Sequence, residues 1–244
     1  NALEVNGVPG VDDDNNGFID DFNGWNFLNG NNNLQDVLNH GTPISGILAA
    51  RTDNSLGVAS VCHNCKVMML KIFDTSFFPV DDAIPGISYA INEGADIISM
   101  SFGTGAPSQA LNDIITTTHN NGIIMTASAG NQNQSNVPIY PAAYTQVIGV
   151  AGTTAQDLKY AQSNYGTWVD ISAPAKTLYS LRNISGQYAY VEGTSFAAPQ
   201  VAGVAALLLS KDSSLTKTQV ENIILSNCDN IDAQNPQYIG LLGC

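Results

Sequence analysis

Residues 193–199 read Gly-Thr-Ser-Phe-Ala-Ala-Pro and place a serine at the start of an apolar segment that runs to Leu209. This segment predicts a buried helix that begins beside Ser195. A helix N-terminus presents free backbone N–H groups and a partial positive charge, which suits a developing oxyanion. The small residues on both sides of Ser195 let a substrate backbone approach. Taken alone, the pattern also fits an ordinary capping serine before a core helix.

Outside this segment, apolar runs alternate with helical patterns. Strands are expected at Val67–Ile72, Asp96–Met100, Gly122–Ala127, Val147–Ala151 and Trp168–Ala173. Helices are expected at Pro43–Ala50, Asp81–Asn92, Ser108–Asn120, Phe196–Leu209 and Thr216–Leu225, the last of which opens with a capping box. The alternation predicts an α/β fold with a mostly parallel central sheet and helices on both faces. No linker or repeat divides residues 1–244, so we expect a single domain, with Asn23–Asn33 as a surface loop.

The composition limits the classes of function. The chain carries 21 Asp and Glu against 8 Lys and Arg, so it has no cationic surface for nucleic acid. It contains no apolar run of 18 residues, so nothing predicts a membrane span. The acidity fits either solubility outside a cell or cation binding. Cys62 and Cys65 could form half of a zinc site, but no second pair stands at ligand spacing, and we expect the pairs 62–65 and 228–244 to form disulfides in an oxidising compartment.

Two further residues occupy places that suit chemistry. His40 precedes a predicted helix and is followed by glycine, and Asn131 follows the strand Gly122–Ala127. In parallel α/β sheets, ligands bind at the carboxyl ends of the strands, where Asn131 would lie. A lone histidine is usually a satisfied structural residue, and an asparagine after a strand is often a turn residue with positive φ. Each signal is weak alone, but the order His40, Asn131, Ser195 in one chain gives them weight together.

Taken together, these motifs resemble the subtilase family of serine proteases. The matching stretches are residues 40–42, 128–131, 193–199 and 201–203, with further likeness at 54–58, 100–103, 140–142 and 163–166. The resemblance covers essentially the whole chain. It implies a three-layer subtilisin-like fold and an endopeptidase that hydrolyses peptide bonds through an acyl-enzyme.

The resemblance also implies the role of each site residue. Ser195 would attack the scissile carbonyl, His40 would accept and return the proton, and Asn131 would bind the oxyanion. The walls of the primary substrate pocket would be Ser101, Phe102 and Gly103 on one side and Ala127, Ser128 and Ala129 on the other. Because these walls are small and uncharged, we expect a neutral, large apolar residue before the cleaved bond of the protein or peptide substrate.

The triad aspartate is the main departure from the family pattern. Before His40 the sequence contains neither the Asp-Thr/Ser-Gly motif nor the apolar strand that carries it in the family. Asp36 is the nearest local substitute. We therefore expect a catalytic domain truncated at both ends, without that strand and without a last C-terminal helix. An N-terminal segment or pro-peptide would be the partner that supplies the missing strand.

An acidic segment after residue 11 predicts a calcium site. Oxygen ligands at Asp12, Asp14 and Asn16, then the Phe18 carbonyl, follow the spacing of an EF-hand-type loop, and Asp20 or Asp21 would close it. The same residues also fit an acidic, solvated turn. The resemblance implies a second calcium site at Thr52, Asn54, Leu56 and Val58.

These observations leave two classes of function open. The first is a secreted, calcium-stabilised serine endopeptidase. The second is a non-catalytic, subtilase-like module that binds peptides through its cleft. A peptide ligase or macrocyclase would share the same catalytic residues and is a variant of the first. The co-occurrence of His40, Asn131 and Ser195 favours the enzyme.

Overall fold

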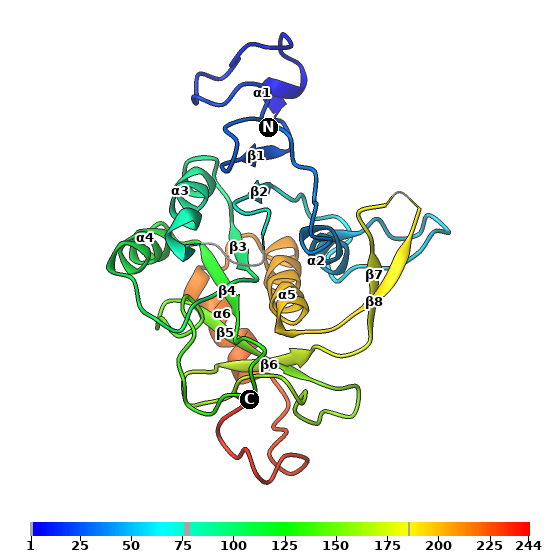
Figure 1. Cartoon of the computed structure of the whole chain (residues 1–244), viewed down its shortest axis with the longest axis vertical. Coiled ribbons are helices and arrows are strands. Elements are labelled where there is room, and N and C mark those ends of the chain that lie inside the picture. Colours follow the sequence, from blue (N-terminus) through cyan, green and yellow to red (C-terminus); the bar gives the residue numbers. More distant parts are fainter. Residues whose placement is uncertain (1, 76–78, 185) are drawn as a thin grey trace.

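The computed structural model describes residues 2–75, 79–184 and 186–244. Its central layer is a sheet of four parallel strands in the order β3-β4-β5-β6. These strands are β3 (Ile97–Met100), β4 (Ile124–Ser128), β5 (Ile148–Thr153) and β6 (Ile171–Pro174). A second parallel pair, β1 (Gly24–Asn26) and β2 (Met69–Lys71), precedes them, so that the strands follow one another from β1 to β6 down Figure 1.

The interior strands are buried on both faces. Every residue of β4 and β5 is buried, as expected for continuous apolar runs. Successive side chains point to opposite faces, so Ile124 joins one hydrophobic core and Met125 joins the other. By contrast, β2 and the first three residues of β3 are only half-buried, and within the described residues no hydrogen-bonded ladder joins these two strands.

Helices cover both faces of the sheet, which makes three layers (Figure 1). The helices α3 (Ile84–Asn92) and α4 (Gln109–Asn120) pack together over the core that contains Met125. The helices α2 (Gly41–Ala49), α5 (Ala198–Lys211) and α6 (Lys217–Ser226) lie on the other side, where α5 packs on β3 and β4. These observations confirm the α/β fold with helices on both faces.

The helix boundaries follow the capping chemistry. Thr216 and Gln219 form the predicted capping box at the start of α6, and the Ser108 hydroxyl accepts the Leu111 N–H at the start of α4. The predicted helix Asp81–Asn92 divides into a 3₁₀ turn, η1 (Val80–Ala83), and α3. The short helix α1 (Ala2–Val5) begins the described chain.

The surface-loop prediction for Asn23–Asn33 was wrong over its first part. Residues 24–26 form β1, and Asn26 is almost fully buried. Its side chain is satisfied there, since its oxygen accepts the Leu28 and Asn29 N–H groups and its nitrogen donates to the Asn33 carbonyl. A polar side chain with internal partners can be buried, which an apolar pattern does not reveal.

A β-hairpin and two disulfides complete the described fold. The strands β7 (Leu178–Leu181) and β8 (Tyr188–Val191) form an antiparallel hairpin that the sequence analysis did not predict. The disulfide between Cys228 and Cys244 closes the C-terminal segment, and a second disulfide joins Cys62 to Cys65, as predicted.

Across the described ranges, no helix combines the length and the apolar character needed to cross a membrane.

Candidate active site

Ser195 lies in a 3₁₀ turn, η2 (Thr194–Phe196), immediately before α5. The sequence analysis placed it in the first turn of that helix, but α5 begins at Ala198. Gly193 enters the turn with φ of +134°, which side-chain-bearing residues rarely adopt. The Ser101 hydroxyl donates to the Ser195 carbonyl oxygen over 2.7 Å, so Ser101 supports the backbone of the serine turn.

Asn131 lies beside the same turn. It follows β4 after Gly130, whose φ is +95°, at the carboxyl edge of the sheet. Its side-chain oxygen accepts the Thr194 N–H over 2.9 Å and the Thr194 hydroxyl over 3.1 Å. These bonds fix the direction of the amide and leave its Nδ2 group available as a donor. A Cβ atom on Gly193 would lie 3.5 Å from that Nδ2, so the glycine keeps the approach to it open.

Thr194 is a site residue that the sequence analysis did not single out. It is fully buried, and its hydroxyl accepts the Gly130 N–H over 3.1 Å while it donates to Asn131. The same hydroxyl therefore connects the loop after β4 to the serine turn. Its position directly before Ser195 in the most specific motif was the available clue.

His40 stands at the start of α2, and its ring meets Phe196, the neighbour of Ser195. The two ring centroids are 6.0 Å apart in an edge-to-face arrangement, and Phe73 lies 6.2 Å from the His40 ring on centroids. Within the described part of the chain, no hydrogen bond joins the His40 ring to the Ser195 hydroxyl. Catalytic hydrogen bonds are often loose without substrate. Burial lowers the pKa of His40 below its ordinary value, although the charge of Asp36 acts in the opposite direction.

Asp36 holds the turn that carries His40. Its carboxylate accepts the backbone N–H groups of Leu38 (3.1 Å), His40 (3.3 Å) and Thr42 (2.8 Å). Partial burial raises the pKa of Asp36, but these hydrogen bonds outweigh it and leave the pKa lowered. One carboxylate oxygen thus holds the turn before α2, and the other accepts an N–H group in the first turn of that helix.

A hollow of about 470 Å³ opens beside Asn131. Its lining includes Gly103, Ser128 and Asn131 from the predicted site, together with Gln132 and Ile139, which the sequence analysis did not name. Ile139 lies between two glycines, since a Cβ atom would stand 2.6 Å from Ile139 at Gly103 and 3.4 Å from it at Gly130. Its side chain therefore packs against both glycines at the wall of the hollow.

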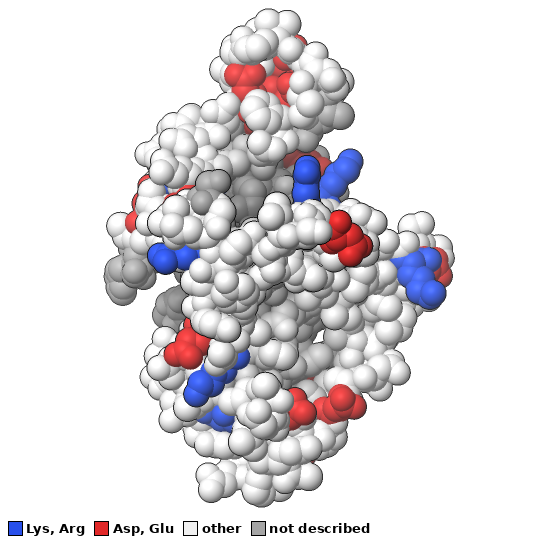
Figure 2. Space-filling model, turned by 90° about the vertical axis from the view of Figure 1, so that its right-hand side faces the viewer, with Lys and Arg blue, Asp and Glu red and all other residues white. Residues whose placement is uncertain are grey.

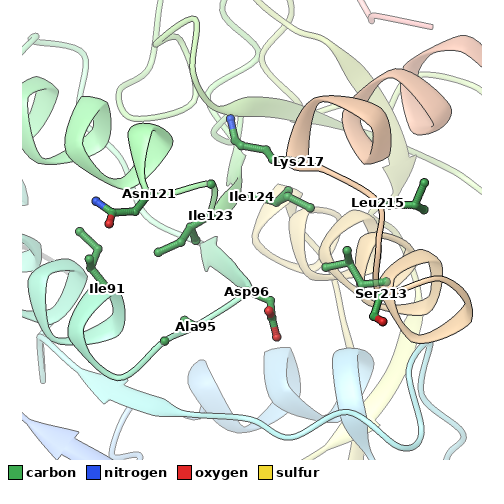
Figure 3. Close-up of a pocket in the computed structure, with 12 residues that line it drawn as sticks. Ile91, Ala95, Asp96, Asn121, Ile123, Ile124, Ser213, Leu215 and Lys217 are labelled. Atoms are coloured by element: carbon green, nitrogen blue, oxygen red, sulfur yellow. The ribbon is translucent and has the colours of Figure 1, made fainter.

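The other predicted pocket residues are not among those that line this hollow. Ala127 and Ala129 are fully buried, and Phe102 packs against the core beneath α3 and α4. A separate pocket has a volume of about 330 Å³. Asp96 and Ile124 are among the residues that line it (Figure 3). Because these residues stand at the amino ends of β3 and β4, this pocket lies at the edge of the sheet opposite Asn131.

The acidic segment places three carboxylates close together. Glu4, Asp12 and Asp14 each bring an oxygen to within 4.8 Å of the others. Glu4, which the sequence analysis missed, is buried and accepts the N–H groups of Asp13 (2.8 Å) and Asp20 (2.9 Å). An all-oxygen donor set of this kind fits calcium. We call residues 4–21 the acidic lobe, and Figure 2 shows acidic side chains gathered there at the top of the molecule.

The remaining predicted metal ligands have other partners in the structure. The Asn16 oxygen accepts the Phe18 N–H, and its nitrogen donates to Asp21 and Glu93. Asp20 accepts the Gly10 N–H. Asp21 is buried and accepts the Tyr89 hydroxyl, which links the lobe to α3.

The ring of Phe18 attaches the same lobe to the body of the protein. It packs edge-to-face against Tyr89 of α3, at 4.8 Å between centroids, and against Trp25, at 5.1 Å.

In the second predicted calcium loop, the Asn54 oxygen accepts the Leu56 N–H and the Thr52 hydroxyl donates to the Ala50 carbonyl. These bonds shape a turn, and calcium binding there, including at Val58, stays a prediction.

Comparison with known proteins gives consistent relatives. Residues 5–240 match the model of the subtilase family. Thermitase of Thermoactinomyces vulgaris is 37% identical over 202 residues, which cover 82% of this chain and 72% of thermitase. A thermophilic serine proteinase of Bacillus sp. (strain AK1) is 37% identical over 190 residues, or 77% of this chain, but the match spans only about half of that protein (47%).

Further relatives extend the comparison. A cell wall-associated protease of Bacillus subtilis (strain 168) is 33% identical over 213 residues, which cover 87% of this chain and 24% of that protein. The crystal structure of a cold-adapted subtilisin-like serine proteinase superposes with a TM-score of 0.75 at 26% identity, and covers 83% of this chain and 72% of its own.

Proposed function

The chain belongs to the subtilase family, and from this premise we propose that it is a serine endopeptidase that cleaves protein or peptide substrates. The observation that carries the proposal is the arrangement of Asn131, Thr194 and Ser195. An amide held by its own oxygen, beside a serine that precedes a helix, is what an oxyanion site requires. The membership of the chain and its relatives support the reaction class.

In the proposed mechanism, the Ser195 hydroxyl attacks the carbonyl carbon of the scissile bond. His40 removes the hydroxyl proton and then delivers it to the leaving amine. Asn131 Nδ2 and the Ser195 backbone N–H donate to the oxyanion of the tetrahedral intermediate. Removal of such an asparagine costs about 10²–10³-fold in turnover, a figure measured on subtilisin, a member of this family. In the second half of the reaction, His40 removes a proton from water, which attacks the acyl carbon, and then returns that proton to the Ser195 oxygen as the ester bond breaks.

We propose that the triad acid arrives on a strand that inserts between β2 and β3. These strands belong to two parallel sheets with no ladder between them in the described residues, and both are half-buried where interior strands are fully buried. A parallel strand in this place would join the two sheets and satisfy their edges. Its carboxyl end would lie at the edge of the sheet that carries Asn131, within reach of the α2 start. An N-terminal segment or pro-peptide is the proposed source.

We also propose that the acidic lobe binds calcium. Glu4, Asp12 and Asp14 would provide the carboxylate oxygens, and the Phe18 carbonyl and Asp21 would complete the set. Bound calcium would neutralise the converging negative charges and hold the lobe in one conformation. The catalytic steps would not pass through it.

Secretion is part of the same proposal. Both cysteine pairs form disulfides, which persist in oxidising compartments. A net charge of -13 supports solubility there, and one relative is named as cell wall-associated.

The substrate preference follows from the hollow beside Asn131. Its described lining residues are uncharged, which supports a neutral residue before the cleaved bond. Because Ile139 occupies the space between Gly103 and Gly130, we propose that medium-sized side chains fit better than the large ones expected from the sequence.

The test is hydrolysis of a chromogenic peptide by this chain, beside a version extended upstream through an Asp-Thr/Ser-Gly strand and a Ser195→Ala control. We expect the extended version to be about 10⁴-fold faster, since that is the cost of losing the orientation of the triad histidine. Equal turnover in both versions would show that another acid, with Asp36 first in line, serves His40.

The same assay separates the other classes. Peptide binding without cleavage in either version would indicate the non-catalytic module. Transfer of the acyl group to an added amine in preference to water would indicate a ligase.

A further inference from the structure

The hairpin of β7 and β8 contacts the helix of the base and leads into the turn of the nucleophile. On β7, the fully buried Ser180 donates its hydroxyl proton to the Pro43 carbonyl of α2 over 2.8 Å. Gly46 of α2 sits so close that a Cβ atom there would stand 2.6 Å from the Ser180 hydroxyl oxygen. On the other strand, β8 ends at Val191, only two residues before the glycine that opens the serine turn.

Asn183, which follows β7, forms hydrogen bonds with the segment just before His40. The Asn183 N–H donates to the Asn39 side-chain oxygen over 2.9 Å, and the Asn183 amide nitrogen donates to the Asp36 carbonyl over 2.6 Å. Asn39 has φ of +55°, a left-handed conformation that asparagine adopts more readily than most other non-glycine residues, and its side chain is held from outside the turn by Asn183. Asp36 supports the turn from within through its hydrogen bonds to the backbone of residues 38–42.

Both Asn183 bonds lie at the solvent-exposed surface. Exposed bonds of this kind contribute little to overall stability, because water replaces them readily. They do, however, reach across 144 residues of sequence to the residue that precedes His40. A small displacement of a catalytic group lowers turnover far more than it lowers stability.

We propose that Asn183 is a positioning residue, which fixes the turn at residues 36–39 and thereby places the His40 ring relative to Ser195. This inference rests on the proposed endopeptidase function. Asn183 touches neither the reacting atoms nor the hollow beside Asn131. It acts through Asn39 and Asp36, and the strands of the hairpin that carries it connect the helix of the base with the turn of the nucleophile.

The test compares two variants that break the Asn183 hydrogen bonds with one matched control. Asn183→Ala removes the amide that donates to Asp36, and Asn39→Gly removes the acceptor of the Asn183 N–H while it relieves the positive φ. The control is Asn121→Ala, because the exposed Asn121 amide likewise donates to a backbone carbonyl, that of Thr117, over 2.9 Å. Asn121 stands at the end of α4, at the far edge of the sheet.

We expect each of the two variants to lower kcat about two- to tenfold, which corresponds to one hydrogen bond, with KM and melting temperature close to those of the parent. Asn121→Ala should leave kcat unchanged. In the same samples, NMR of the histidine rings should show a shifted and broadened His40 signal in the two variants only.

Unchanged kcat together with unchanged His40 signals in both variants would overturn the inference. A fall in kcat that the control shares would do so as well, because it would reveal a general effect of losing a surface hydrogen bond. If the parent chain fails to hydrolyse peptides even when extended upstream, the endopeptidase proposal falls. The His40 signals would still decide whether Asn183 positions the ring.

Discussion

Replacement of Thr194 by valine tests the oxyanion arrangement through one hydroxyl. Valine keeps the shape of threonine and retains the backbone N–H that donates to the Asn131 oxygen. It removes the hydroxyl that donates to that same oxygen and accepts the Gly130 N–H. Because Thr194 is fully buried, water cannot easily take the place of the lost hydroxyl.

The structure sets the size of both effects. The Gly130 N–H, whose bond is part-buried, loses its acceptor, and the cost of a fully buried donor without a partner, about 1–3 kcal/mol, is the upper limit of the loss of stability. For a chain of this length, that loss lowers the melting temperature by roughly 2–12 °C. Complete loss of an oxyanion donor costs about 10²–10³-fold in turnover. Since Asn131 keeps one of its two bonds, we expect a smaller decrease of about tenfold in kcat, or about 1.4 kcal/mol, with KM little changed.

The assay measures kcat, KM and melting temperature for the parent, Thr194→Val and Thr194→Ser, all on the upstream-extended chain. Serine retains the hydroxyl, so Thr194→Ser should keep most of the turnover. If Thr194→Val unfolds at a lower temperature but turns over substrate as fast as Thr194→Ser, the hydroxyl supports only the fold, and our account of Asn131 orientation is wrong.

Three further predictions test the lobe, the base and the pocket. At free calcium about 100 times its Kd, bound calcium adds about 2.7 kcal/mol to the free energy of unfolding, so EDTA should lower the melting temperature by roughly 5–10 °C. The variant Glu4→Gln should show a smaller difference between its melting temperatures with and without EDTA. Equal melting temperatures of the parent with and without EDTA would exclude the site. In the proposed mechanism neutral His40 is the active form, so kcat/KM should fall as the pH drops through the pKa of His40. The negative charge of Asp36 raises that pKa, and Asp36→Asn removes this charge. The acid limb of the pH profile of the variant should therefore lie at lower pH than that of the parent. Ile139→Ala should raise the ratio of kcat/KM for phenylalanine over alanine before the cleaved bond about tenfold or more, and an unchanged ratio would place the specificity elsewhere.

Apolar periodicity and capping residues predicted most of the regular structure. The five expected strands all occur; each begins one to three residues later than expected, and β4, β5 and β6 end one or two residues later. Thr216 and Ser108 begin α6 and α4 as their chemistry requires. The pattern failed where polar residues are buried or strands are short. Asn26 is inside because its amide finds three partners in a turn that folds back on it, and the strands of the β7–β8 hairpin are four residues each.

The candidate groups of the site, His40, Asn131 and Ser195, could be predicted from the sequence because each motif is local and its residue types are specific. What those motifs could not contain is the support that comes from distant segments. The contact of Asn183 with Asn39 and that of Ile139 with Gly103 join residues far apart in the chain, and the burial of Glu4 depends on how residues 4–20 fold back on themselves. Such contacts depend on how the layers pack, and a hydrogen bond or a filled space exists only once the backbone has brought both partners together. The sequence by itself therefore determined the class of fold and the candidate reacting groups, whereas the tertiary structure decided which distant segments contact them and which side chains line the hollow beside them.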